Sequence, residues 1–532
     1  MKARKTFIIV SVSVCFLIFV WAYFLTGALL AFFLVGPLIF IGVHDIFQQK
    51  QSIKRNFPVV GRLRYLFEKI RPEIYQYFIE SDTDGTPINR NDRAVVYQRA
   101  KQQIDTTPFG TQLNVYADGY EWMSHSLKPI DFHKMDHHPK VLFGDGRCSQ
   151  PYNMSVLNVS AMSFGSLSQN AIEALNGGAK IGGFAHNTGE GGLSPYHLKH
   201  GGDLIWQIGT GYFGARDKEG NFSDEAFKIN AAKPSVKMIE IKLSQGAKPG
   251  HGGILPGIKN TPEIAAIRQV EPGTTVYSPP YHSAFGTPLE LVQFIARLRE
   301  LSGGKPVGFK LCIGMKSEFL SICKAMIKLN EFPDFITVDG GEGGTGAAPP
   351  EFSNFVGMPM LDGLAFVDNA LRGYGIRDKM RIIASGKIFT GFHMVRAMAL
   401  GADTCNSARA MMMALGCIQA LRCNTNACPT GVATQNPALM KGLVVDDKKH
   451  RVANFHKHTV ESFVELMGAS GIDNKSKISR SHIYRRVQMD QVKSFEEVFP
   501  TLENNLFLNG GAVPAEYSVH IKNAAAEEFS VL

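Results

Sequence analysis

The sequence has few cysteines, and their scarcity excludes one class of protein. Only eight occur among 532 residues, and outside one short stretch they are scattered along the chain. A small secreted protein held together by disulfides carries a much denser set. Three of the eight, Cys417, Cys423 and Cys428, lie within one stretch of twelve residues. Their grouping predicts a metal or redox role in a reducing compartment.

The body of the chain also lacks any long run of lysine and arginine and any nucleic-acid-binding motif. The net charge is nevertheless +9 at pH 7. This basic balance suits anionic lipid or anionic small ligands, and we expect no nucleic acid among the partners. Charged residues form 19% of the chain and hydrophobic residues 45%, which excludes a disordered protein.

Charge is absent altogether from Thr6 to Val43. This run is too long for a signal peptide, and too long for one membrane span of about 20 residues. We therefore predict a transmembrane hairpin in residues 1–45, with spans near 7–24 and 28–43. Pro37 and the shortness of the second span leave a re-entrant or tilted hairpin open, and a buried hairpin of a soluble protein is the alternative. Basic residues on both sides put both ends of the run in the cytoplasm.

Residues 46–150 are polar and aromatic and contain proline and Asp-Gly turns. We predict a helical linker that precedes the main domain and lies against it or against the membrane surface. The segment carries no catalytic signal.

From about residue 155 to 410, short apolar runs alternate with helical patterns. Such alternation predicts parallel strands, and eight units in about 250 residues have the size of an α/β fold of the (β/α)8 TIM barrel type. A doubly wound sheet is the alternative, but no G-x-G-x-x-G follows the first predicted strand. We place the barrel in residues 151–440. Its predicted strands are 155–163, 182–187, 237–244, 274–280, 306–312, 335–341, 381–387 and 403–409.

Polar residues and glycines follow these strands, at the end of a TIM barrel where active sites lie. Glycine loops let backbone N–H groups approach phosphate oxygens, so three such loops at one end predict a cofactor that carries phosphate. One loop alone would be an ordinary turn. In strand order the residues are Ser163; Asn187, Thr188 and Glu190; Lys242 on the third strand; Lys310 on the fifth; Asp339 with GGEGGTG; Ser385, Gly386 and Lys387; and Ser407, Ala408 and Arg409.

Five stretches resemble the synthase domain of glutamate synthase and occur in the same order as in that family. They are AMSFGSLS (161–168), NTGEGG (187–192), IKLSQGAKPGHGGILPG (241–257), GEGGTGAAP (341–349) and CPTGVATQNP (428–437). The resemblance covers about residues 150–440. It is strongest to the stand-alone, membrane-anchored, FMN-binding glutamate synthase domain proteins of bacteria.

The resemblance implies a barrel that carries FMN and a 3Fe–4S cluster. In the family the cluster ligands follow a C-x5-C-x4-C spacing, which Cys417, Cys423 and Cys428 match. Zinc would more often use paired C-x2-C ligands and a fourth cysteine or histidine. Three buried cysteines without a metal are the remaining alternative.

The resemblance also implies roles for single residues. Glu190 and Lys242 would act at the reacting centre, and Lys248 and Arg268 would hold 2-oxoglutarate, since a dicarboxylate needs two cationic anchors. The implied flavin-binding residues are Ala161, Met162, Ser163, Asn187, Lys242, Lys310, Gly341, Gly344, Thr345, Ser385, Gly386, Lys387 and Ser407.

Two residues at the oxoacid site depart from the family pattern. His251 stands where the large glutamate synthases have Glu, and Ile254 stands where they have Gln. The bound oxoacid can therefore differ from 2-oxoglutarate or be gripped differently.

Parts of the large glutamate synthases are not expected in this chain. The hairpin leaves no room for a glutaminase domain, so ammonia or another amine should come from solution or a partner. Residues 441–532 are too few for the family's β-helix, and we predict a C-terminal helical extension there. No nicotinamide-binding fold is recognisable, so electrons should come from ferredoxin, a reductase subunit or a membrane carrier.

We therefore predict a flavin- and iron–sulfur-dependent oxidoreductase of glutamate synthase type. It would reductively aminate 2-oxoglutarate or a related 2-oxoacid at the inner (cytoplasmic) membrane, with the catalytic domain facing the cytoplasm. The alternative is a membrane-associated amine or amino-acid dehydrogenase that passes electrons to quinone or a redox partner. A purely structural role would leave the glycine loops and the three cysteines unexplained.

Overall fold

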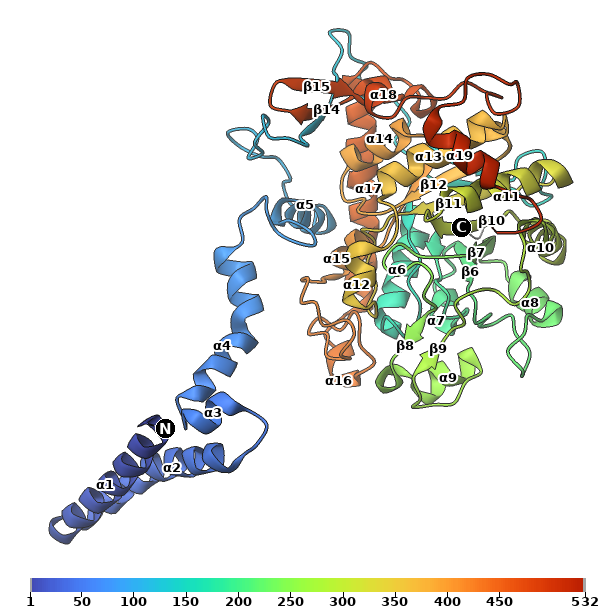
Figure 1. Cartoon of the computed structure of the whole chain (residues 1–532). Helices are drawn as coiled ribbons and strands as arrows, with labels where there is room; N and C mark the ends of the chain where they lie inside the picture. Colours follow the sequence, from blue (N-terminus) through green and yellow to red (C-terminus); the bar gives the residue numbers. More distant parts are fainter. Residues whose placement is uncertain (1, 530–532) are drawn as a thin grey trace. The chain divides into compact units, whose positions relative to one another are not determined.

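The computed structural model describes residues 2–529 and divides into two compact units, residues 1–90 and 91–532 (Figure 1). The first unit begins with a hairpin. Helix α1 (Lys2–Phe24) is followed by a 3-10 turn, η1 (Thr26–Ala31), which runs directly into α2 (Phe32–Phe47). The uncharged sequence favours helices here because apolar side chains can be exposed to lipid while the backbone satisfies its own hydrogen bonds.

Each arm of the hairpin is long and apolar enough to cross a membrane. The arms Ala3–Phe24 and Thr26–Phe47 have 22 residues each. Large apolar side chains stand exposed along them, for example Phe16 at 66% and Trp21 at 71%. The second arm is longer than the predicted 28–43, because η1 extends the helical conformation back to Thr26.

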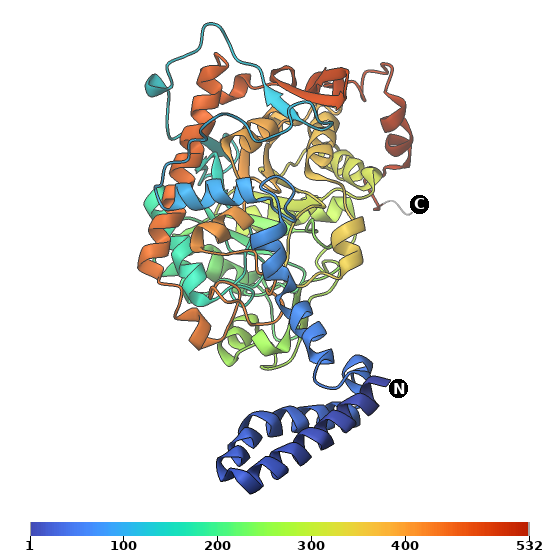
Figure 2. The ribbon, with the colours of Figure 1, turned by 90° about the vertical axis from the view of Figure 1, so that its left-hand side faces the viewer.

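A buried carboxylate ties the hairpin to the helices that follow it. These are α3 (Ser52–Asn56), α4 (Gly61–Ile74) and the π-helix η2 (Tyr75–Ile79), drawn in blue in Figure 2. Asp45 accepts a hydrogen bond from the Val59 N–H at 3.0 Å and forms an ion pair with Arg62 at 2.8 Å. Because Asp45 is fully buried, these donors are what makes its burial tolerable.

The second unit is built on a closed barrel of parallel strands, as the sequence predicted. The barrel is closed by β13 next to β4, with Cys405 opposite Leu157. Residues such as Ile241 and Phe309 are fully buried in the strands. In chain order the strands are β4 (Leu157–Val159), β5 (His186–Asn187), β6 (Leu204–Ile208), β7 (Val236–Lys242), β10 (Val307–Cys312), β11 (Phe335–Asp339), β12 (Arg381–Ser385) and β13 (Thr404–Ser407).

Helices follow the barrel strands along the chain. Several begin with a side-chain cap, as at Ser168 and Thr287, which accept hydrogen bonds from the first turns of their helices. The helices are α6 (Gln169–Gly182), α7 (Pro195–Leu198), α8 (Asp224–Ala231), α9 (Pro262–Arg268), α10 (Pro288–Leu301), α11 (Lys316–Leu329), α12 (Pro350–Phe355), α13 (Met360–Gly373), α14 (Gly391–Ala399) and α15 (Arg409–Leu415).

One predicted barrel strand was wrong. Residues 274–280 contain only β9 (Val276–Tyr277), which pairs antiparallel with β8 (Ile254–Leu255) outside the barrel. The third barrel strand is β6, whose five residues are all buried. The sequence signal for β6 is weak because only the four-residue helix α7 separates it from β5, so no amphipathic pattern marks a new β/α unit. Lys242 therefore ends the fourth strand rather than the third.

Segments before and after the barrel belong to its compact unit. Before it come α5 (Arg90–Ala100), β1 (Glu121–Met123), η3 (Phe132–Lys134) and the pair β2 (Lys140–Phe143) and β3 (Tyr152–Ser155). After it come α16 (Pro437–Met440), α17 (Val445–Ala469), β14 (Ile483–Gln488), β15 (Gln491–Ser494), α18 (Phe495–Val498) and α19 (Ala515–Asn523).

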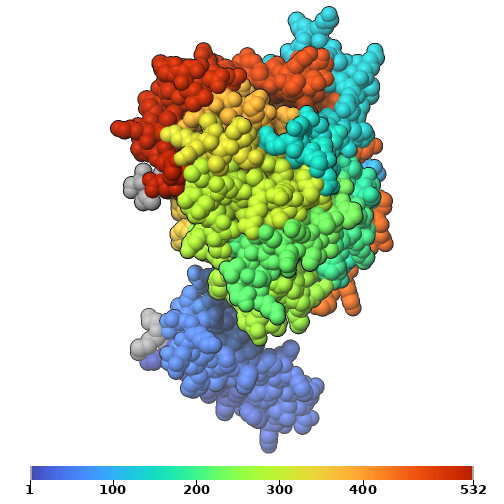
Figure 3. All heavy atoms as spheres, turned by 90° about the vertical axis from the view of Figure 1, so that its right-hand side faces the viewer, coloured from blue at the N-terminus to red at the C-terminus, as the bar shows by residue number. Residues whose placement is uncertain are grey.

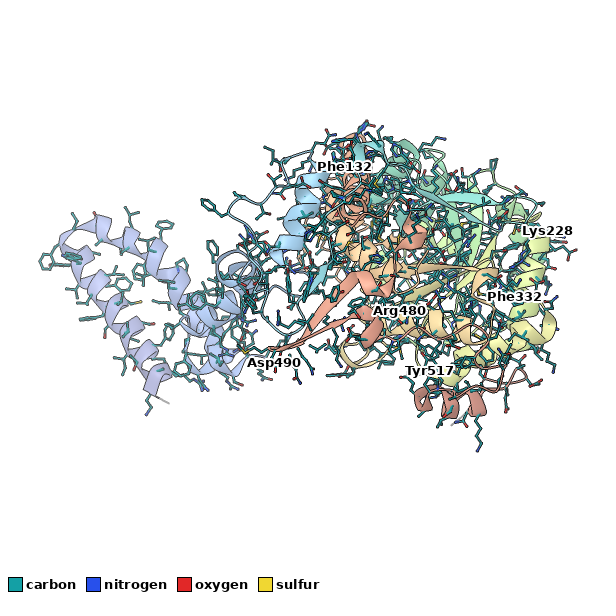
Figure 4. The ribbon with its side chains drawn as sticks, turned by 90° about the horizontal axis from the view of Figure 1, so that it is seen from above. Phe132, Lys228, Phe332, Arg480, Asp490 and Tyr517 are labelled. Carbon is teal, nitrogen blue, oxygen red and sulfur yellow. The ribbon has the colours of Figure 1, made fainter. Side chains whose placement is uncertain are left out.

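We predicted a helical extension for residues 441–532, but the structure shows that this segment also contains two strands. Strands β14 and β15 form a hairpin, and β14 also pairs with β1, some 360 residues earlier. A partner so distant in sequence leaves no local pattern. Two side chains hold this segment against α13 (Figure 4). Arg480 forms an ion pair with Asp368 at 2.9 Å, and the Tyr517 hydroxyl accepts a hydrogen bond from Asn369 at 3.2 Å. Helix α19 lies against α11 (Figure 3).

Candidate active site

The barrel brings the predicted site residues to one end. Most lie at or just after the carboxyl end of a strand, so the parallel order places them around a common mouth, while Lys310 lies within β10 and Arg268 ends helix α9. Close approaches confirm the neighbourhood of the first two loops: a Cβ on Gly189 would meet the Ser163 nitrogen at 2.7 Å. The serines at the ends of β4 and β12 also meet, with Ser160 Oγ 3.2 Å from Ser385 Oγ.

Glu190 lies among three cationic side chains. Its carboxylate forms an ion pair with Lys242 Nζ at 2.8 Å. Burial alone would raise the pKa of Glu190, but the charges of Lys242, Lys248 and Arg268 outweigh burial and hold it below its usual range. One carboxylate against three cations leaves a positive excess, which suits an anionic ligand.

Lys248 and Arg268 have N–H groups that make no hydrogen bond within the described residues. Burial lowers the pKa of Lys248 to about 8, and within residues 2–529 its ammonium makes no hydrogen bond or ion pair. Arg268 is 5% exposed and donates from Nη2 to the Phe164 carbonyl at 3.0 Å, while its buried Nε has no partner among the described residues. Burial lowers the Arg268 pKa to about 10. Unused donors on buried cations are expensive unless a ligand takes them.

Glycines make the room for Glu190. A Cβ on Gly253 would lie 2.6 Å from Glu190 Oε1, and one on Gly209 would lie 2.8 Å from Oε2. Only residues without a side chain fit on either side of the carboxylate. Gly253, one of the family-like glycines of residues 250–253, thus has a steric reason here.

His251, one of the two departures from the family pattern, lies in the loop between Lys248 and β8, and Ile254, the other, is the first residue of β8. The His251 ring meets Phe352 of α12 edge-on at 5.3 Å, and its Nδ1 is 3.0 Å from the Gly252 carbonyl oxygen. Ile254 pairs with Tyr277. Both residues are close to Lys248 in sequence. These contacts are with Phe352, Gly252 and Tyr277 rather than with the cations themselves.

The glycine loops after β11 and β12 meet two further cations. Arg409 Nη2 donates to the Glu342 carbonyl at 2.8 Å, and a Cβ on Gly344 would lie 3.2 Å from Arg409 Cδ. Burial and the Arg409 charge lower the pKa of Lys387, while Glu342 and Asp92 oppose this. Adjacent cations beside glycine-rich backbone fit a phosphate group.

The remaining predicted residues lie around these loops. Gly341, Thr345 and Gly386 follow β11 and β12, and Ala161 and Met162 follow β4. Ser407 ends β13 and donates to the Ile388 carbonyl at 2.7 Å.

A buried network that the sequence analysis missed lies below the mouth. Glu240 is fully buried and accepts hydrogen bonds from Asn187 at 2.8 Å, Gln207 at 2.6 Å and Thr337 at 2.6 Å. A usable signal existed, because Glu240 lies two residues before Lys242 and so on the same face of the strand. Lys310 forms an ion pair with Asp339 at 3.0 Å and lies opposite Lys242 in the barrel sheet.

A second missed pair supports Lys242 from behind. His282 Nε2 is 2.9 Å from the Lys242 carbonyl oxygen, and Nδ1 is 3.1 Å from the Tyr212 hydroxyl. Burial lowers the pKa of His282 to about 4, so the ring is neutral at pH 7. No spacing in the sequence links these residues to Lys242.

The three cysteines influence one another electrostatically. Burial and the charges of the other two thiols raise the pKa of Cys417 to about 12. Burial would also raise the pKa of Cys428, but hydrogen bonds from Thr430 and from backbone N–H groups of residues 430–433 lower it. Such donors stabilise a thiolate, so the donor set fits an iron–sulfur cluster in its chemistry. Among residues 2–529, no three His, Cys, Asp or Glu side chains are arranged to hold a metal ion.

Comparison with known proteins decides the family. Residues 128–473 match the family model for the conserved region in glutamate synthase. The chain belongs to the glutamate synthase family. It is therefore an oxidoreductase of glutamate synthase type, and the resemblance noted in the sequence is confirmed.

Relatives in this family differ in how much of them the chain spans. The glutamate synthase large subunit-like protein YerD of Bacillus subtilis is 40% identical over 484 residues, covering 84% of this chain and 92% of YerD. An archaeal glutamate synthase [NADPH] of Methanocaldococcus jannaschii is 37% identical over 318 residues, covering 59% of each chain. Among solved structures, flavocytochrome b2 with pyruvate bound aligns with a TM-score of 0.43 at 12% identity, covering 83% of this chain and 92% of that chain. A likeness this distant identifies neither cofactor nor substrate.

Proposed function

We propose that the protein reductively aminates 2-oxoglutarate or a related 2-oxoacid, using external ammonia or an amine and an external electron donor. The observation that carries this proposal is the cluster in which Glu190 faces Lys242, Lys248 and Arg268. A buried positive excess with unused donors suits a small anion that carries two carboxylates.

Lys248 and Arg268 would anchor the oxoacid. Arg268 is held by its bond to the Phe164 carbonyl and by the Phe213 ring, 5.2 Å from the guanidinium carbon, so its remaining donors point in a defined direction. A guanidinium can grip one carboxylate bidentately, and the Lys248 ammonium can take the other as a point charge. The substrate carboxylates would then neutralise the excess charge.

Glu190 and Lys242 would move protons at the reacting carbon. Ammonia condenses with the oxoacid carbonyl, water leaves, and the imine takes up a hydride and a proton to give the amino acid. Since Glu190 and Lys242 are ion-paired at 2.8 Å, either can hold the proton that condensation and reduction exchange. The neutral His282 would keep the Lys242 backbone in place.

FMN and a 3Fe–4S cluster are the proposed cofactors. When bound, FMN supplies hydride chemistry and the cluster supplies one-electron transfer. Lys387, Arg409 and the loop at Gly344 would hold the flavin phosphate, and Cys417, Cys423 and Cys428 would bind the cluster. The cysteine segment lies beside the glycine loop, because a Cβ on Gly346 would be 3.4 Å from Cys423 Cβ.

The proposal also includes an external electron donor and attachment to a membrane. The apolar hairpin would anchor the chain in the inner membrane, with the barrel in the cytoplasm, and ferredoxin or a reductase subunit would supply electrons. The hairpin also favours a second candidate: an amine or amino-acid dehydrogenase that passes electrons to quinone. Both directions use the same residues.

An anaerobic reoxidation experiment tests the proposal. The full-length protein in detergent should show flavin absorption and a 3Fe–4S signal in low-temperature EPR. Mixing the reduced protein with 2-oxoglutarate and ammonia should reoxidise the flavin and yield glutamate. Reduction of the flavin by an amino acid, followed by electron transfer to a quinone, would support the dehydrogenase instead. Protein without flavin and without iron would contradict both.

A further inference from the structure

One buried lysine outside the oxoacid cluster connects the cysteines to the barrel mouth. Lys259 ends the 3-10 turn η4 (Gly257–Lys259) and is 2% exposed. Its Nζ donates to three backbone carbonyl oxygens: Ser166 at 3.0 Å, Cys423 at 2.8 Å and Ala433 at 2.9 Å. An ammonium has three N–H donors, and all three are used here. A neutral amine could not make the same set, so the geometry requires the charged form.

The three carbonyls belong to segments that converge at this point. Ser166 lies in the loop after β4, Cys423 is the central cysteine, and Ala433 follows the third cysteine. Other bonds run across the same junction: Gln435 Nε2 donates to the Gly165 and Leu167 carbonyls at 3.0 and 2.8 Å, and Ser168 Oγ donates to the Gly431 carbonyl at 2.7 Å. Among these donors, only Lys259 brings a full charge.

That charge is close to the cysteines. The Lys259 ammonium is 2.8 Å from the carbonyl oxygen of Cys423, so a buried full charge lies directly against the cysteine segment. A fixed cation near an iron–sulfur cluster favours the reduced cluster, which is more negative by one charge.

We propose that Lys259 is a positioning residue that holds the cysteine segment against the loop after β4 and raises the reduction potential of the cluster bound there. This inference rests on the proposed 3Fe–4S cluster. The alternative is a lysine that only stabilises the fold. Lys305 is such a residue: it is 5% exposed and donates to the Ala231 and Lys233 carbonyls at 2.5 and 3.3 Å, just before β10 at the opposite end of the barrel.

The test compares Lys259→Met and Lys259→Gln with the matched control Lys305→Met in the full-length, anaerobically purified protein. Three quantities are measured: iron and sulfide per flavin, hydrogen–deuterium exchange of residues 417–436, and the cluster midpoint potential by EPR-monitored titration. Lys259→Met should lose half or more of its iron and exchange faster in 417–436. Lys259→Gln keeps two donors but no charge, so it should retain more cluster at a lower potential, by about 59 mV for a tenfold change in the one-electron equilibrium.

The control should match the wild type in all three quantities. Lys259 variants that change no more than Lys305→Met overturn the proposal. Faster exchange with an unchanged potential also overturns it, because Lys259 would then be only a structural tie. Wild-type protein that holds no iron contradicts the proposed cofactor and this inference with it, whereas a normal cluster in wild type and in Lys259→Met contradicts this inference alone.

Discussion

Buried cations lie in two regions of the barrel mouth, and the two differ in how their donors are used. In the oxoacid cluster, Lys248 makes no hydrogen bond or ion pair within residues 2–529, and Arg268 keeps a buried nitrogen without a partner. At the cysteine segment, every donor of Lys259 meets a backbone carbonyl. Spare donors indicate a place for a ligand, and satisfied donors indicate a part that holds the protein in shape.

The largest effect should come from Arg268→Gln. Losing a buried charged anchor should lower kcat/KM for the oxoacid by about a hundred- to a thousand-fold, while the free energy of unfolding changes by less than about 1 kcal/mol. Stopped-flow reoxidation of the reduced flavin and thermal unfolding would measure the two quantities. Arg297→Gln is the control, since Arg297 also faces a phenylalanine ring but pairs with Asp224 at the surface. If Arg268→Gln lowered the free energy of unfolding as strongly as it lowered kcat/KM, Arg268 would be a structural residue, and the contrast between the oxoacid cluster and Lys259 would be lost.

The next largest effect concerns Glu240, whose carboxylate accepts three hydrogen bonds. Glu240→Gln places an amide among three donors, so the free energy of unfolding should fall by about 2–3 kcal/mol. Denaturant unfolding of the detergent-solubilised protein checks this, with exposed Glu263→Gln, which loses one bond from Tyr196, as control. If both variants are equally stable, the network contributes less to stability than its geometry indicates.

A smaller effect tests the steric room around Glu190. In Gly253→Ala the new methyl would lie 2.6 Å from Glu190 Oε1, so the carboxylate must move. We expect about a tenfold loss in kcat/KM and a destabilisation of about 1 kcal/mol. Gly314→Ala, where a Cβ meets nothing within 4 Å, should leave both unchanged. Unchanged kinetics in Gly253→Ala would mean that the position of Glu190 is not critical.

The smallest effect is a pH dependence of stability. Because the native pKa of Glu190 is below its usual range, the ion pair stabilises the wild type relative to Glu190→Gln above the ordinary glutamate pKa of about 4.3. This advantage should disappear as the pH falls through the lower native pKa. Unfolding midpoints of both proteins between pH 7 and pH 3 would reveal it. A difference that stays constant over this range would show that the cations do not hold the pKa down.

Much of the fold was readable in the sequence because it is local. The alternation of apolar runs and helical patterns predicted the parallel barrel, and the polar residues after each run predicted its mouth. The prediction failed at β6 and at residues 274–280. The helix before β6 has only four residues, so no helical pattern marked the start of that strand. Residues 274–280 resemble a barrel strand in composition, but β9 within them pairs with β8 outside the barrel.

The sequence by itself determined the barrel, because its short-range patterns repeat, and its family motifs indicated the family and singled out Glu190, Lys242, Lys248 and Arg268. Only the tertiary structure decided which buried cations have spare donors. Lys259 meets Cys423, 164 positions away, and Lys242 meets His282, 40 positions away. Contacts of this range depend on how loops converge in three dimensions, and no period of 2 or 3.6 residues records them.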